Sequence, residues 1–206
     1  GRSDAAIARI RLDTVDVPFE GEGHAFLGGL SAMCRGDLAE TRRLCQETLA
    51  SLGTGGSGRM VKGFARSWMA SADAMAGRAD DARLELAGIR WWDQDPDACE
   101  WDSEVSIAEA WVCAAEGSVS QAISITRQAA TKEAELGRPA WEVVLLQTAT
   151  QFGDHATAAR LDELARLVQG PRASAAAAPA AAPAADAGDA PAAAPLRSAA
   201  FAARPA

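Results

Sequence analysis

The chain has 206 residues, of which 49% are hydrophobic, and a formal net charge of -8 at neutral pH. Attraction to a phosphate backbone needs clustered Lys and Arg, so this acidic balance argues against nucleic-acid binding by this segment itself. No run approaches the ~20 apolar residues that a membrane span needs, and the N-terminus shows no charged-then-apolar leader. We therefore expect a cytoplasmic protein with no membrane partner.

The residue types favour helices over strands. Tyrosine is absent, and alanine, leucine, arginine, glutamate and glutamine are abundant, as is typical of helical proteins. The large apolar side chains lie almost entirely before residue 170, so the core must form there. We predict an all-α protein with a connecting segment at 1–19, a helical domain at 20–170 and an Ala/Pro-rich tail at 171–206. The segment at 1–19 resembles the end of a preceding region more than the start of a domain. We therefore expect the chain to be a fragment.

An internal repeat organises the predicted domain. Four glycines recur at intervals of about 40 residues, each after a helix-favouring segment, and a small residue follows each glycine five positions later. Glycine can end a helix in the left-handed conformation, a polar residue can start the next helix, and a small side chain lets two helices approach closely. The glycines are Gly36, Gly77, Gly117 and Gly153, and the small residues are Thr41, Ala82, Ala122 and Ala158.

This pattern predicts helical hairpins of the tetratricopeptide kind, about four of them, stacked into a solenoid with a continuous core. The expected helices are 23–35, 37–52, 59–76, 79–90, 102–116, 118–136, 139–152 and 154–169. The repeat is longer than the 34 residues of the strict tetratricopeptide, which indicates longer connections between hairpins. Three segments provide these connections: a glycine-rich link at 53–58, a Trp- and Asp-rich link at 90–102 and a short break at 137–139.

The glycine-rich link from Gly53 to Gly58 fits the spacing of a phosphate-binding loop. Such a loop needs a preceding strand and a following lysine, whereas a predicted helix precedes this link and Arg59 and Met60 follow it. We interpret it as a flexible connector.

The acidic run in the next link partly matches a calcium-binding loop, with Asp93, Asp95 and Asp97 at alternate positions and Glu104 further on. The position that should be glycine for the sharp turn is Ala98, so we interpret the run as a solvated loop rather than a metal site. No metal or cofactor is expected.

The six tryptophans fall into two groups. Trp68, Trp111 and Trp141 lie on the first helix of their hairpins, where they either fill the core between helices or line a groove for a ligand; we favour the core. The others cluster in the link at 90–102 and are the better candidates for a partner-binding surface. They are Trp91, Trp92 and Trp101.

The remaining chemistry-bearing residues suggest no catalytic centre. His24 and His155 lie at opposite ends of the repeat array, and His155 is expected on the surface in the first turn of a helix. The cysteines occur in helical contexts where a reduced thiol packs as a small hydrophobe; they are Cys34, Cys45, Cys99 and Cys113. We therefore expect no enzyme activity.

The tail after Gly170 and Pro171 consists of alanine runs interrupted by proline. Alanine favours helix, but recurrent proline prevents one, and large apolar residues are almost absent. We predict residues 172–206 to be disordered.

Three stretches carry a family resemblance: AWVCAAEG at 110–117, WEVVLLQTATQFGD at 141–154 and AARL at 158–161. Over about residues 20–170 the chain resembles the helical region of LuxR-type transcription regulators of the signal-transducing ATPase class, similar to the maltose regulator. The resemblance implies sensing of a small-molecule inducer or a protein partner, relayed to ATPase and DNA-binding domains outside this chain. The alternative is a stand-alone tetratricopeptide-like adaptor that docks a peptide or protein.

Overall fold

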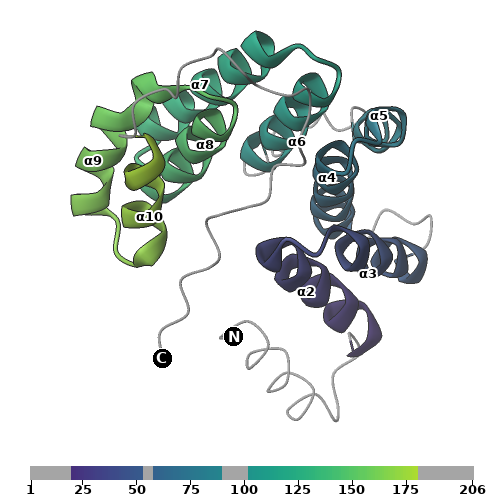
Figure 1. The fold of residues 1–206 in the computed structure, drawn as a ribbon. Helices are drawn as coiled ribbons and strands as arrows, with labels where there is room; N and C mark the ends of the chain where they lie inside the picture. The colour runs from purple at the N-terminus through teal and green to yellow at the C-terminus, as the bar shows by residue number, and fades with distance from the viewer. Residues whose placement is uncertain (1–19, 53–57, 90–101, 181–206) are drawn as a thin grey trace. The chain divides into compact units, whose positions relative to one another are not determined.

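The computed structural model describes residues 20–52, 58–89 and 102–180, and all regular elements in these ranges are helical (Figure 1). The prediction of an all-α fold is confirmed, and the eight predicted helices match the observed ones to within about three residues at each end. The chain divides into two compact units, residues 1–108 and 109–206. None of the described helices is both long enough and apolar enough to cross a membrane.

The first unit contains α2 (Glu20–Arg35), α3 (Leu38–Ser51), α4 (Arg59–Met75) and α5 (Ala79–Ala87). Each helix packs against the next, and α2 also contacts α4. The four helices therefore form two hairpins, and the first helices of both hairpins touch one another.

Aromatic rings join these two first helices. Trp68 of α4 is buried, and its ring stacks on Phe26 of α2 at a centroid distance of 5.0 Å and on Phe64 at 5.5 Å. Phe26 and Phe64 are half-buried and pack against the buried cluster that contains Trp68, and burying each large apolar side chain contributes roughly 1.5–3 kcal/mol. The cluster consists of Cys45, Ala65, Trp68 and Met69. The core role predicted for Trp68 is confirmed.

Two glycines within α2 bring it close to α3. A Cβ atom on Gly28 would lie 3.0 Å from Leu44 Cδ1, and one on Gly29 would lie 3.0 Å from Cys45 Sγ. Glycine is unfavourable within a helix, so its presence here is explained by this close approach.

The second unit contains the rest of the described chain. The boundary between the units passes through α6 (Asp102–Ala115). Within the second unit α7 packs on α8, α8 packs on α9, and α10 contacts both α8 and α9. The elements after α6 are α7 (Val119–Glu135), α8 (Pro139–Gln151), the 3-10 turn η3 (His155–Thr157), α9 (Ala158–Leu167) and α10 (Pro171–Ala180).

Leucines and one tryptophan fill the core of the second unit. Leu145, Leu161 and Leu164 are fully buried. Trp111 is buried and meets Phe152 edge to face at a centroid distance of 4.8 Å, whereas Trp141 is half-buried. The predicted core role therefore holds for Trp111 and is weaker for Trp141.

Five of the helices in the described ranges end with the same hydrogen-bond pattern. A glycine with φ between 70° and 92° donates its amide to the carbonyl three residues back, and the next amide donates to the carbonyl five residues back. This is the Schellman arrangement, which satisfies the last carbonyls of a helix. The glycines are Gly36, Gly77, Gly117, Gly137 and Gly153. Four of them were predicted from the repeat, and Gly137, interpreted as part of a short break, ends its helix in the same way.

The small residues predicted to admit close helix packing lie as expected in three of the four repeats. Thr41, Ala82 and Ala122 are fully buried. Ala158 is only half-buried, and Thr157 takes the inward position instead. The reason is the 3-10 turn that precedes α9: it winds more tightly than an α-helix and moves the inward position one residue earlier.

The tail begins later than predicted. Residues 171–180, assigned to the tail, form α10, and Ala173, Ala176 and Ala177 of this helix are buried. Pro171 is tolerated because the first turn of a helix needs no amide donor there. Residues 181–206 and the segment at 1–19 lie outside the described residues. A single core that continues through all four hairpins stays a prediction.

Candidate functional site

The tryptophans predicted to bind a partner, Trp91, Trp92 and Trp101, lie outside the described residues, which stop at 89 and resume at 102. Both flanks of this segment are held in the first unit, where Ile89 and Ser103 are buried. The acidic run of the same segment is likewise outside the described ranges, except for the half-buried Glu104 in α6.

The glycine-rich link is described only at its last residue. Gly58 has φ of 71° and precedes α4 in the left-handed conformation. The left-handed backbone favours glycine here, and a Cβ atom would lie 2.8 Å from Leu52 Cδ2, so the Leu52 side chain would have to move. The local structure accounts for this glycine without a phosphate ligand.

Buried carboxylates paired with arginines form the most distinctive polar feature of the described chain. Each of the strongest pairs joins two different elements, and in each the carboxylate is almost fully buried while the arginine reaches solvent. An acid at such a position is stabilised by its partner, and removal of one partner leaves an uncompensated charge. The pairs that join separate elements in this way are Arg42–Asp73, Arg127–Asp154 and Arg160–Glu142.

Asp73 of α4 binds two arginines from different elements. Its Oδ1 accepts hydrogen bonds from Arg78 Nε at 3.0 Å and Nη2 at 2.7 Å, and its Oδ2 accepts one from Arg42 Nη1 of α3. Its side chain has no exposed area. This single carboxylate therefore links α3, α4 and the turn that enters α5.

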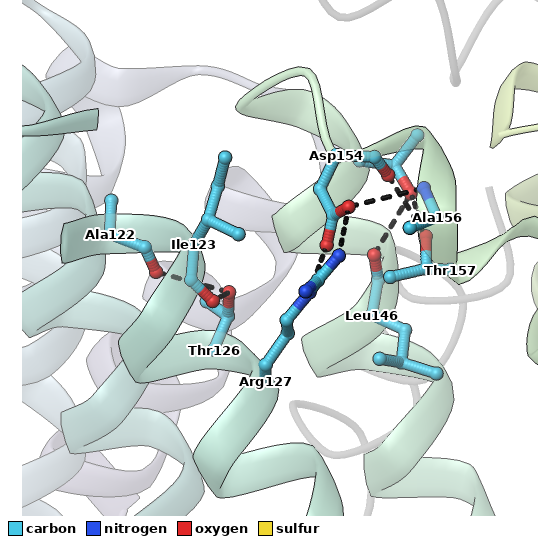
Figure 2. A network of polar contacts seen from close by, with 9 residues as sticks. Ala122, Ile123, Thr126, Arg127, Leu146, Asp154, Ala156 and Thr157 are labelled. Carbon is cyan, nitrogen blue, oxygen red and sulfur yellow. Dashed lines mark hydrogen bonds and ion pairs between the residues drawn. The ribbon is translucent and has the colours of Figure 1, made fainter. Parts of the chain in front are cut away.

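Asp154 joins three elements of the second unit. Figure 2 shows Arg127 reaching from α7 to the Asp154 carboxylate, with Nε at 2.6 Å from Oδ2 and Nη2 at 2.5 Å from Oδ1. Asp154 Oδ1 also accepts the Ala156 amide at 3.1 Å and so caps η3. The Asp154 carbonyl accepts the Thr157 hydroxyl, which is 3.1 Å from that of Thr150 on α8. The network fixes α7, α8 and η3 relative to one another.

The third pair joins α8 to α9. Arg160 donates from Nε to Glu142 Oε1 at 2.6 Å and from Nη2 to Oε2 at 3.0 Å, and its Nη1 binds Glu163. Hydrogen bonds to these carboxylates raise the pKa of Arg160, and the bond to Asp154 raises that of Arg127. Bidentate guanidinium–carboxylate pairs also fix the relative orientation of the two side chains. These pairs therefore help to set the orientation of the helices that carry them.

Part of this polar framework has a local signal in the sequence, although the repeat pattern did not predict it. Asp73 stands four residues before Gly77 and Arg78 one residue after it, and Glu133 and Arg138 stand in the same way around Gly137. Glu133 is buried, and its Oε2 lies 3.4 Å from Arg138 Nε. The Schellman turn brings the residue after glycine back over the last turn of the helix, so acid and arginine at this spacing meet.

Among the described thiols, Cys45 is buried, whereas Cys34 and Cys113 are half-buried. Burial raises the pKa of Cys45 to about 12 and also raises that of Cys113. A protonated thiol is a poor nucleophile. Both therefore match the prediction of thiols that pack as small hydrophobes, while Cys99 lies outside the described residues.

The histidines lie in different parts of the chain. His155 is exposed in η3, as predicted for a surface residue in the first turn of a helix. His24 lies in α2 of the first unit. In the ranges that the structure describes, no three His, Cys, Asp or Glu side chains gather closely enough to hold a metal ion.

Comparisons with protein-family models, with curated proteins and with solved structures found no match to this chain. The class of the protein therefore follows from its own architecture: an all-α protein of helical hairpins held by glycine turns, buried apolar faces and inter-helix ion pairs.

Proposed function

We propose that this chain is the helical-repeat sensor and protein-interaction region of a LuxR-type transcription regulator. It binds an inducer or a protein partner and relays binding to ATPase and DNA-binding domains that lie outside the chain. The observation that carries the proposal is the recurrence of one hairpin design, in which glycine turns join successive helices. Helical repeats of this kind offer extended surfaces for binding partners.

The polar framework supports a relay. Arg42–Asp73 and Arg127–Asp154 each tie a helix of one hairpin to an element of the next hairpin along the chain. A ligand that favours one arrangement of two hairpins would act on neighbouring domains by a shift of population. Paired charges suit this role because their directional bonds define discrete arrangements.

Trp91, Trp92 and Trp101 are the proposed partner-contacting residues. Aromatic side chains contribute disproportionately to the binding energy of protein interfaces. The segment that contains them is anchored at both flanks by the buried Ile89 and Ser103.

The gene sequence on both sides of this chain tests the regulator assignment. A nucleotide-binding motif upstream and a DNA-reading helix-turn-helix downstream are expected in the same reading frame. A frame with neither would refute the regulator and favour the stand-alone adaptor, the second candidate.

A reporter assay in the full-length regulator then tests the tryptophans. Replacing Trp91, Trp92 and Trp101 together by alanine is expected to reduce the response to inducer at least tenfold. Replacement of Leu84, which is 71% exposed on α5, is the control and should leave the response unchanged. A full response in the triple variant would exclude these tryptophans as the contact surface.

A further inference from the structure

We draw no further inference here: the strongest candidate, the side-chain cluster of Arg42, Asp73 and Arg78 where α3, α4 and the turn into α5 meet, belongs to the polar framework already described, because both guanidinium groups bind the buried Asp73 carboxylate and nothing in the described part of the chain points to a ligand there.

Discussion

α4 and α10 hold equivalent places in their units but are attached by different means. Each contacts the two helices that precede it. α4 spans Arg59–Met75 and contributes the buried Trp68 and Met69, whereas α10 spans Pro171–Ala180 and contributes buried alanines. Helices at equivalent positions in the helix order therefore bury side chains of very different size, large apolar ones in α4 and alanines in α10.

The largest effect is expected from removing the main anchor of α4. Trp68→Ala deletes a ring that is 4% exposed and stacks on Phe26 and Phe64, so it should lower the free energy of unfolding by about 3–5 kcal/mol. Urea unfolding followed by circular dichroism measures the loss. Leu84→Ala, at an exposed site on α5, serves as the control and should change the value by less than about 0.5 kcal/mol.

The thiol next to Trp68 should make the first unit sensitive to alkali. Burial raises the pKa of Cys45 to about 12 in the folded chain, against 9.0 for an exposed thiol. The unfolded chain therefore releases this proton first as pH rises, and stability falls by about 1.4 kcal/mol per pH unit between these two values.

Unfolding of the chain and of Cys45→Ala, measured in reductant across that pH range, isolates this contribution. The variant should lose stability less steeply. Identical slopes for the two proteins would mean that the thiol does not resist ionisation in the folded state.

The packing of α7, α8 and η3 depends on the buried carboxylate of Asp154. Asp154→Ala removes both the cap of η3 and the partner of Arg127, so a loss of about 2 kcal/mol is expected. Asp37→Ala is the matched control, since Asp37 caps α3 through the Glu40 amide and is exposed. That change should cost only about 1 kcal/mol. A larger loss at Asp37 would contradict the importance assigned to the Arg127 pair.

A side chain should be tolerated less well at the turn after α4 than at an open position within α2. Gly77→Ala forces a methyl group onto a residue with φ of 77° and should destabilise by about 1 kcal/mol, although nothing lies within 4 Å of the added atom. Gly23→Ala, in α2 with equally open surroundings, should stabilise by about 0.5–1 kcal/mol. Thermal unfolding of both variants measures these opposite signs.

A much smaller loss of stability than at Trp68 is expected for a change in α10. Ala176→Glu should lower the free energy of unfolding by about 1 kcal/mol, because the described side chains that α10 buries are alanines, which contribute little apolar area. Calorimetry of the full chain provides the measurement. A loss as large as that of Trp68→Ala would remove the distinction between the two helices.

Local patterns predicted most of the helices and the turns between them. Glycine at Gly36, Gly77, Gly117 and Gly153 has a conformational preference that acts within a few residues, so the ends of those helices could be read directly. The buried positions of Trp68 and Trp111 followed from their place on the first helix of a hairpin. The tryptophans of the link at 90–102 stay a prediction, because they lie outside the described residues.

Contacts between distant residues decided the rest. Arg127 and Asp154, or Arg42 and Asp73, meet only after separate helices have packed, and no short-range pattern announces such a pair. α10 shows the same limit: its alanines and prolines predicted disorder, yet the surface of α8 and α9 offers a place where three methyl groups are buried. The chain's local preferences thus determined where helices begin and end, and tertiary packing decided which polar groups pair and how far the folded part extends, because burial energy depends on surfaces that exist only once the helices assemble.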